Sequence, residues 1–429
     1  MRVIDDKIFF NFAVTDDSHT MASYLERGGY LALKTTLATL RPSDVEKEVA
    51  ASGLRGRGGA GFTTGIKWSF VDKKSPSVYL CCNADEGEPG TFKDRWILEQ
   101  NPHQLIEGIL LASYALRVRR AFIYIRGEFD LPYRRLTDAL SEAKHSGYTG
   151  ANILDSEFSC DILVIQGGGA YVCGEESSLY ASIEGLKGYP RNKPPFPAVQ
   201  GLYGAPTVVN NVETLANVPW IINRGAATFK TLGTEKHPGT KLFGVSGHIK
   251  KPGLYELPLG YPLRDLIFGI CGGVAGSGKL KAVIPGGSSS PLLLPSEVET
   301  ATLDAESMQA HASMLGSGGV IVISEGVCMV RLLQVLTRFY AHESCGQCVP
   351  CREGTPWMND IVSRIVAGRG VQGDLDSLER ITKGIMGNTV CALGDAAAMP
   401  VSAFIKKFRV EFEYYIEHGR SMNDGRLEI

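Results

Sequence analysis

One short run of cysteines constrains this chain more than any other feature of its sequence. The run is Cys345-Gly-Gln-Cys348-Val-Pro-Cys351, and a fourth cysteine, Cys391, follows further along. A cubane iron–sulfur cluster needs four thiolates, and a C-x2-C-x2-C loop can wrap one side of it while a distant cysteine closes the other. Structural zinc usually uses two separate C-x2-C pairs. The spacing therefore favours a [4Fe-4S] cluster, with zinc as the alternative, and predicts an electron-transfer protein.

The remaining composition supports metal ligation over disulfide bonding. Ten cysteines in 429 residues are too few for a disulfide scaffold. The amino terminus carries two acids where a signal peptide would be apolar, and no stretch approaches the length of a membrane span, so we expect a reducing compartment and no membrane insertion. A net charge of -2 argues against nucleic-acid binding. The other cysteines are expected to be small buried residues: Cys81, Cys82, Cys160, Cys173, Cys271 and Cys328.

The first half of the chain alternates apolar runs with helical patterns. We expect an extension at residues 1–45, with one helix over Met21–Ala38, and an α/β domain at residues 46–240. This alternation predicts a mostly parallel sheet covered on both faces. The expected strands are Val78–Cys82, Ala121–Arg126 and Asp161–Gln166. The expected helices are Pro102–Leu116 and Leu131–Lys144.

The second half changes character twice. Residues 241–335 read as a small α+β domain, and residues 336–429 keep helical spacing of apolar residues, which predicts a helical bundle that carries the cluster. The expected elements of the α+β domain are strands at Lys241–Ser246, Leu254–Leu257, Lys281–Ile284 and Val320–Ser324 and a short helix at Pro262–Cys271.

Two glycine-rich loops are candidate ligand sites. The first, Gly56-Arg-Gly58-Gly-Ala-Gly61, matches G-x-G-x-x-G, but a helix and not a strand is expected before it, so an ordinary Rossmann motif is rejected. Its bare backbone, with Arg55, Arg57 and Lys67 nearby, suits a phosphate or a flat ring. A structural turn is the alternative.

The second loop follows an expected strand and leads into a helix. Gly167-Gly-Gly169 is followed by Gly174-Glu175-Glu176, and amides at a helix start bind phosphate. The two acids in the first turn oppose an anion and suit a sugar hydroxyl or a ring N–H instead. Simple helix capping is the alternative.

Further polar and aromatic clusters lie at the ends of expected elements. Three acids follow the strand Val78–Cys82 in the segment Asn83–Gly90, where open α/β sheets bind ligands. The alternative is a charged surface turn. Helix capping alone could explain Asn210, Asn211 and Thr214. Aromatic residues beside glycine-rich or proline-rich loops are candidates for stacking on a base: Phe62, Phe70 and Phe196, with Lys193 nearby.

Together these segments resemble the NADH-oxidising flavoprotein subunit of bacterial respiratory complex I. The resemblance extends from about Gly28 to about Gly419. The stretches that carry it are Gly53–Phe62, Cys82–Gly90, Gly167–Glu176, Asn210–Thr214, Glu343–Arg352 and Cys391–Asp395. One departure is Gly87, where a bulkier residue is usual, which predicts either a looser turn or a peptide that can flip.

The resemblance implies a Rossmann-like FMN-binding α/β domain, a ubiquitin-like β-grasp domain and a helical bundle with a [4Fe-4S] cluster. It implies one pocket in which NADH stacks on FMN. The residues that it places against FMN are Gly56, Arg57, Gly58, Gly61, Lys67, Asn83, Asp85, Gly174, Glu175, Glu176, Asn210, Asn211 and Thr214. Those that it places against NADH are Phe62, Phe70, Glu88, Glu176, Lys193 and Phe196, with Tyr171 close to both ligands.

The resemblance also implies an activity and partners. We expect NADH dehydrogenase activity, in which NADH passes a hydride to FMN, Glu88 positions the nicotinamide, and single electrons reach the cluster. A thioredoxin-like [2Fe-2S] subunit and a larger iron–sulfur subunit are the expected partners, on the cytoplasmic face of the cell membrane. The alternatives are a diaphorase subunit of an NAD-reducing hydrogenase or formate dehydrogenase, whose chains often carry an additional fused domain that we do not expect here, and a zinc-stabilised binding module.

Overall fold

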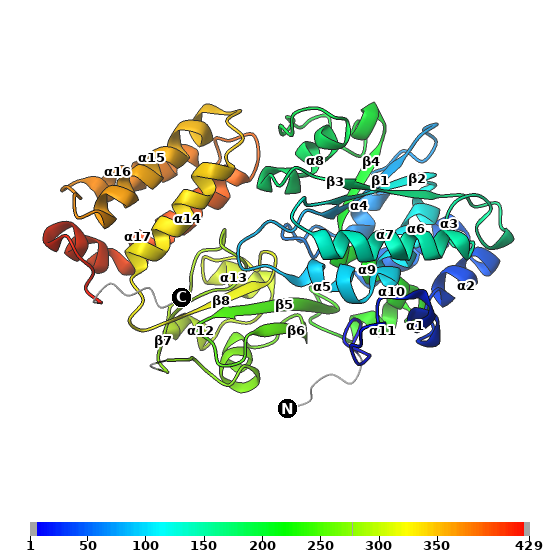
Figure 1. The fold of residues 1–429 in the computed structure, drawn as a ribbon, viewed down its shortest axis with the longest axis horizontal. Coiled ribbons are helices and arrows are strands. Elements are labelled where there is room, and N and C mark those ends of the chain that lie inside the picture. Colours follow the sequence, from blue (N-terminus) through cyan, green and yellow to red (C-terminus); the bar gives the residue numbers. More distant parts are fainter. Residues whose placement is uncertain (1–6, 277, 424–429) are drawn as a thin grey trace. The chain divides into compact units, whose positions relative to one another are not determined.

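The computed structural model describes residues 7–276 and 278–423 and divides them into two compact units (Figure 1). The first unit contains the described chain through Gly87, Phe92–Leu242 and Glu256–Gly260. The second contains Glu88–Thr91, Phe243–Tyr255 and the described chain from Tyr261 onward. The boundaries between the four segments predicted from the sequence stay a prediction.

The first unit is built on a four-stranded parallel sheet with the order β3-β2-β1-β4. Its strands are β1 (Tyr79–Ala84), β2 (Arg120–Ile125), β3 (Asp161–Gln166) and β4 (Thr207–Asn211). Consecutive side chains of a strand point to opposite faces, and most of those on the two central strands, β1 and β2, are buried, so the centre of the sheet is covered on both faces. The predicted α/β fold is confirmed, although β4 was not expected from its short, polar-ended sequence.

The helices of the first unit include the two that the sequence predicted in this region. Helix α6 is buried almost all round, including its polar residues His103, Gln104 and Glu107, and it packs against β1 and β2. The bounds are α3 (Pro42–Ser52), α4 (Thr64–Ser69), α5 (Lys93–Gln100), α6 (Pro102–Leu116), α7 (Asp130–His145), α8 (Glu176–Ile183), α9 (Val212–Ala216), α10 (Val218–Arg224) and α11 (Ala226–Lys230), with 3-10 turns at Ile153–Asp155, Tyr171–Gly174 and Leu202–Gly204.

The single helix predicted over Met21–Ala38 is wrong, because the chain forms α1 (Met21–Glu26) and α2 (Leu31–Thr39) instead. Gly28 and Tyr30 both have positive φ values, which a continuous helix does not allow. The buried carboxylate of Glu107 stabilises the break, since it accepts hydrogen bonds from the Tyr24 hydroxyl at 2.5 Å and from the Tyr30 N–H at 3.0 Å. A tertiary contact therefore overrides the local helical pattern.

The second unit contains a four-stranded sheet with the order β6-β5-β8-β7. The two central strands, β5 and β8, run parallel, and β7 runs antiparallel to β8. Parallel first and last strands at the centre of a small mixed sheet match the predicted β-grasp domain. The bounds are β5 (Thr240–Gly247), β6 (Gly253–Pro258), β7 (Leu280–Ile284), β8 (Gly319–Ser324), a π-helical segment at Asp265–Ile270, α12 (Pro295–Val298) and α13 (Ala305–Ala310).

The predicted helical bundle closes the second unit. It consists of α14 (Met329–Glu343), α15 (Val349–Val366), α16 (Asp374–Ile385) and α17 (Leu393–His418). Helix α16 buries Leu375, Leu378, Thr382 and Ile385, the three-to-four-residue spacing of one helix face. Lys407 on α17 pairs with Glu297 on α12 at 2.6 Å, so the bundle is tied to the β-grasp part of the same unit.

Candidate functional site

The glycine-rich loop of the first unit lies between two helices. Helix α3 ends at Ser52 and α4 begins at Thr64, and the first strand of the described chain begins only at Tyr79. The rejection of an ordinary Rossmann motif is therefore confirmed. Gly61 has a φ of 65°, a left-handed value that favours glycine, and the loop is closed by a 2.8 Å hydrogen bond from the Gly56 N–H to the Phe62 carbonyl.

Arg57 turns its side chain into the protein interior. The residue is 2% exposed, and its guanidinium donates to the Pro238 carbonyl at 2.8 Å. Burial lowers the pKa of Arg57 to about 10, although Glu213 opposes the change. The Arg57 N–H donates to Thr214 Oγ1 at 2.8 Å. The guanidinium is thus committed to the interior, and the part of Arg57 that belongs to the loop is its backbone.

The loop meets the carboxyl ends of two neighbouring strands. Asn83 on β1 lies in register with Asn211 on β4, and a Cβ added to Gly58 would come within 3.0 Å of Asn211 Cβ. Asn83 Nδ2 donates to the Gly174 carbonyl at 2.8 Å, and Asn83 Oδ1 accepts the Asp85 N–H at 3.0 Å. Residues from both glycine-rich regions and both strand ends therefore lie close together at the carboxyl ends of β1 and β4.

Helix α4 adds a charged group to this region. Trp68 is buried and donates to Asn210 Oδ1 at 2.9 Å, which fixes the helix beside β4. The neighbouring Lys67 pairs with Glu176 at 2.8 Å, and Lys193 pairs with the other oxygen of Glu176 at 2.6 Å. Burial opposes ionisation of Glu176, but the two ammonium groups outweigh it and lower the pKa of this carboxyl. Glu176 therefore stays charged between two lysines.

Glu175 and Glu86 both cap helices. Glu175 precedes α8, and its Oε2 accepts the N–H groups of Ser177 at 2.8 Å and Ser178 at 3.1 Å. For Glu175 the capping alternative is confirmed. Glu86 accepts the first three N–H groups of α5 at 2.9, 2.9 and 3.0 Å. Burial raises the pKa of Glu86 to about 7. Of the three acids that follow β1, Glu86 therefore stabilises the start of helix α5.

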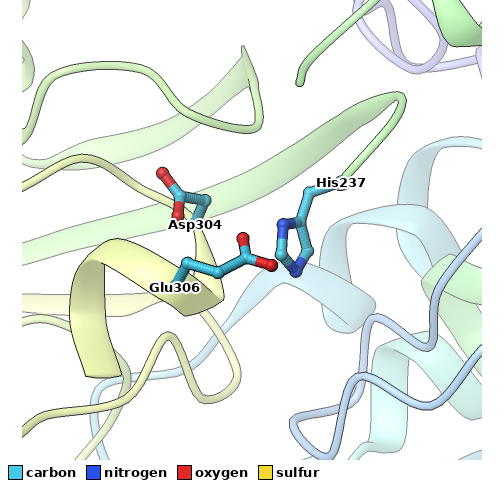
Figure 2. Close-up of side chains that lie close together, drawn as sticks. All are labelled: His237, Asp304 and Glu306. Atoms are coloured by element: carbon cyan, nitrogen blue, oxygen red, sulfur yellow. The ribbon is translucent and has the colours of Figure 1, made fainter. Parts of the chain in front are cut away.

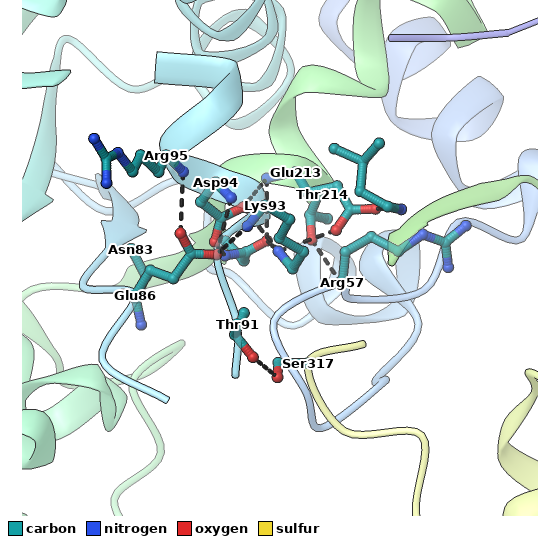
Figure 3. Close-up of polar contacts among 12 residues, drawn as sticks. Arg57, Asn83, Glu86, Thr91, Lys93, Asp94, Arg95, Glu213, Thr214 and Ser317 are labelled. Atoms are coloured by element: carbon teal, nitrogen blue, oxygen red, sulfur yellow. Dashed lines mark hydrogen bonds and ion pairs between the residues drawn. The ribbon is translucent and has the colours of Figure 1, made fainter. Parts of the chain in front are cut away.

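Sequence reasoning missed a buried charge network beneath the loop (Figure 3). Lys93 Nζ lies 2.8 Å from Asp94 and 3.0 Å from Glu213, and Lys241 Nζ lies 3.2 Å from Glu213. Lys93 and Lys241 are 1% and 2% exposed, and charged groups are rarely so buried unless they are paired. Lys241 also donates to the Arg57 carbonyl at 2.9 Å. The network therefore contacts the glycine-rich loop from the protein interior. No sequence pattern indicated it, because only Lys93 and Asp94 are adjacent in the chain.

The aromatic residues predicted to stack on a base are exposed, which is unusual for phenylalanine. Phe62, Phe70 and Phe196 expose 51%, 60% and 58% of their surface. The rings of Phe62 and Phe70 lie 6.3 Å apart, within the range of an aromatic pair. Tyr171 lies beside Gly87, where an added Cβ would come within 3.1 Å of its ring. The three phenylalanine rings therefore present apolar surface to solvent.

Glu88 belongs to the second unit. Its Oε1 accepts the Ser289 N–H at 2.8 Å, and the Ser288 hydroxyl lies 3.4 Å away. The structure thus holds Glu88 through a serine-rich loop that the sequence did not single out.

The four predicted cluster cysteines lie in the helical bundle. Cys345 is in the loop after α14, Cys348 caps α15, and Cys351 is in its first turn, where the Ser344 hydroxyl lies 3.2 Å from its sulfur. Cys391 lies between α16 and α17. Burial raises the pKa of the Cys351 thiol, as expected for a sulfur shielded from water. The six other cysteines are all buried, as predicted.

The two helices that flank Cys391, α16 and α17, both pack against α15, which carries Cys351. A Cβ on Gly354 of α15 would come within 2.6 Å of Ile385 at the end of α16, so the two helices approach closely there. Asp395 in the first turn of α17 accepts the Gly387 N–H at 2.8 Å, which closes the loop around Cys391.

The set of possible ligands suits a cluster better than zinc. A [4Fe-4S] cubane takes four cysteine thiolates, one on each iron, and Cys345, Cys348 and Cys351 follow the C-x2-C-x2-C spacing. Structural zinc usually takes two separate C-x2-C pairs, whereas this region has one crowded loop and one distant cysteine. The donor set therefore fits a [4Fe-4S] cluster.

One group of possible ligands does not form a site within either unit. Figure 2 shows Asp304 and Glu306 at helix α13 together with His237. Asp304 already caps α13, since it accepts the Ser307 N–H at 2.9 Å. His237 belongs to the first unit and the two acids to the second.

No helix in the described part of the chain is long and apolar enough to cross a membrane.

Three family models match successive parts of this chain. Residues 49–220 match the Nuo51 FMN-binding domain, residues 241–323 the SLBB domain, and residues 331–415 the NADH-ubiquinone oxidoreductase-F iron-sulfur binding region.

Whole proteins match over nearly the full chain. An NADH-quinone oxidoreductase subunit of Rhizobium meliloti is 52% identical over 94% of this chain and 96% of its own, and the corresponding subunit of Rickettsia bellii is 50% identical over 96% and 99%. A solved NAD+-reducing [NiFe]-hydrogenase is 37% identical with a TM-score of 0.83, over 94% of this chain and 69% of its own. The chain therefore belongs to the NADH-quinone oxidoreductase-F family.

Proposed function

We propose that this chain is the electron-input subunit of a respiratory NADH:quinone oxidoreductase, complex I, and that it oxidises NADH with FMN and a [4Fe-4S] cluster. The observation that carries the proposal is the combination, in one chain, of a glycine-rich ring-binding site with a four-cysteine cluster site. NADH donates two electrons together, whereas a [4Fe-4S] cluster accepts one. Bound FMN would supply the conversion between the two.

The FMN site is assigned to the gathered residues of the first unit. Bare backbone at Gly56, Gly58 and Gly61 would lie along the ring or phosphate, because no side chain keeps a ligand away. The amide groups of Asn83 and Asn211 are held by neighbours and would present fixed donors and acceptors. The remaining proposed contacts are Arg57, Lys67, Asp85, Gly174, Glu175, Glu176, Asn210 and Thr214.

The NADH contacts are assigned by the chemistry of each side chain. The exposed rings of Phe62, Phe70 and Phe196 offer stacking surfaces for adenine. Lys193 supplies a positive charge for a phosphate, and Glu176 supplies an acceptor for a sugar hydroxyl. The proposed contacts also include Tyr171, and Glu88 is assigned to position the nicotinamide.

The electrons leave through the cluster held by Cys345, Cys348, Cys351 and Cys391. The proposed partners are a thioredoxin-like [2Fe-2S] subunit and a larger iron–sulfur subunit. Through them the chain would lie on the cytoplasmic face of the cell membrane. A diaphorase subunit of an NAD-reducing hydrogenase is the second candidate, because a solved hydrogenase chain shares 37% identity. Mass spectrometry of proteins that co-purify with the untagged chain distinguishes them.

Anaerobic titration of the full chain with NADH tests the proposed activity. Flavin absorbance should bleach and a reduced-cluster signal should appear by electron paramagnetic resonance. Cys348→Ala should remove the cluster signal and leave FMN bound and reducible. Cys328→Ala is the matched control, since Cys328 is a buried cysteine of the same unit outside the cluster set. Flavin that stays oxidised under excess NADH would refute the proposal.

A further inference from the structure

The loop Pro285–Pro291 of the second unit is polar in sequence but buried in structure. It reads Pro-Gly-Gly-Ser-Ser-Ser-Pro and directly follows β7. Ser288 and Ser290 are fully buried, and Ser289 is 8% exposed. Loops usually run over the surface, because buried backbone needs hydrogen-bond partners. The hydrogen-bond partners of this loop therefore show which part of the protein it supports.

The loop forms hydrogen bonds to the segment that contains Glu88 and packs closely against it. The Ser288 N–H donates to the Pro89 carbonyl at 3.1 Å, and the Ser289 N–H donates to Glu88 Oε1 at 2.8 Å. Gly287 has a φ of 97°, and a Cβ added there would lie 2.6 Å from Glu88 Cγ. The Glu88 side chain thus lies against bare backbone, and its carboxylate is fixed by a backbone donor.

A hydroxyl pair continues this contact to helix α14. Ser288 Oγ lies 3.4 Å from Glu88 Oε1 and 2.8 Å from the Tyr340 hydroxyl, and Tyr340 is 1% exposed. The Ser288 hydroxyl donates its one proton to Glu88 Oε1. Ser288 must then accept from Tyr340. The direction of both bonds follows from the chemistry of the groups.

Tyr340 stands on the helix that leads into the cluster loop. Helix α14 ends at Glu343, and the first cluster cysteine is Cys345. We propose that Ser288, Ser289 and Tyr340 position the Glu88 carboxylate for NADH, and so connect the nicotinamide-binding group to the helix that precedes the cluster. This inference rests on the proposed function of Glu88.

The test is a double-mutant cycle in the full chain assembled with its native partners, with NADH as substrate. Ser288→Ala and Tyr340→Phe should each lower kcat/KM for NADH by roughly 2- to 10-fold, the worth of one hydrogen bond. In a Glu88→Ala background, neither change should have an effect, because the group on which they act is gone. A general weakening of the fold would instead lower kcat/KM in both backgrounds.

Ser290→Ala is the matched control in the same loop. Ser290 is equally buried, and its hydroxyl has no hydrogen-bond partner among residues 7–276 and 278–423. Its removal should leave kcat/KM unchanged. If Ser288→Ala does not assemble, Tyr340→Phe carries the cycle alone, since it removes one oxygen from a ring that stays packed.

Two results would overturn the inference: unchanged kcat/KM in both single variants, or equal losses with and without Glu88. Failure of the proposed function is a different result, because wild-type enzyme would then show no flavin reduction by NADH.

Discussion

Glu213 is the carboxylate on which the buried network of the first unit depends, and Glu213→Gln tests that role. Its Oε2 faces two ammonium groups, Lys93 at 3.0 Å and Lys241 at 3.2 Å, and its Oε1 accepts the Leu242 N–H at 2.8 Å. Glutamine keeps the size and one acceptor but removes the charge. It also places N–H donors where two cations need an acceptor.

The expected loss follows from burial and distance. At an effective dielectric constant of about 20, each ion pair at this distance has a gross attraction of about 5 kcal/mol. Desolvation offsets most of this, and breaking a buried pair by removing one partner typically costs about 3–5 kcal/mol. Because Glu213 faces two ammonium groups and is fully buried, we expect a loss near the upper end of that range.

The loss of unfolding free energy caused by Glu213→Gln should become smaller as pH rises. Burial lowers the pKa of Lys241 to about 8 from its ordinary 10.5, and Glu213 opposes this change. A lysine with a lowered folded-state pKa destabilises the fold below that pKa and ceases to do so as pH rises toward 10.5. Without Glu213, Lys241 loses its proton more readily. The free-energy difference between wild type and variant should therefore be smaller at pH 9 than at pH 7.

Urea unfolding at fixed excess FMN measures the effect. Trp68 is a buried probe of the first unit, and Trp357→Phe removes the exposed tryptophan of the second. Glu128→Gln is the matched control, because Glu128 pairs with Arg126 at 2.8 Å but is half exposed, so less than about 1 kcal/mol is expected. A Glu213→Gln loss no larger than this control, or one that grows from pH 7 to pH 9, would refute the reasoning.

Three further changes test other parts of the structure. Gly65→Ala should lower FMN affinity in a fluorescence titration and cost about 1–3 kcal/mol, because its Cβ would lie 2.4 Å from the Ala50 backbone and push apart the helices that flank the glycine-rich loop. Lys193→Met should raise the pKa of Glu176 and raise KM for NADH by roughly 3- to 10-fold without loss of FMN, as steady-state kinetics and flavin content would show. Cys391→Ser should abolish or strongly weaken the cluster signal in paramagnetic resonance and lower the iron content, while far-ultraviolet circular dichroism stays unchanged.

The sequence was informative wherever local pattern and tertiary structure agree. Helix α6 and strand β3 have the predicted bounds. A long, mostly apolar segment and a short apolar run between turn residues can each adopt few other secondary structures. The cysteine spacing and glycine-rich loops located both candidate sites. The assignments of individual residues to FMN and NADH stay predictions.

The missed features depend on contacts between distant residues. Glu107 breaks the amino-terminal helix from another part of the chain, and Glu213 meets Lys241 only after folding. The partners of each of these residues lie far away along the chain, so no local sequence pattern marks them. Arg57 shows the same limit, since nothing in its glycine-rich surroundings indicates that the guanidinium turns inward.

The two acids that cap α5 and α8 limit where an inhibitor of the first unit can place a phosphate group. Glu86 and Glu175 occupy the amide groups that open these helices, so a pyrophosphate mimic designed for a helix start meets a carboxylate at both places. Under the proposed function, recognition of a ligand phosphate then falls to the backbone of the glycine-rich loop and to Lys193. A mimic should therefore direct its phosphate at these groups and not at the start of α5 or α8.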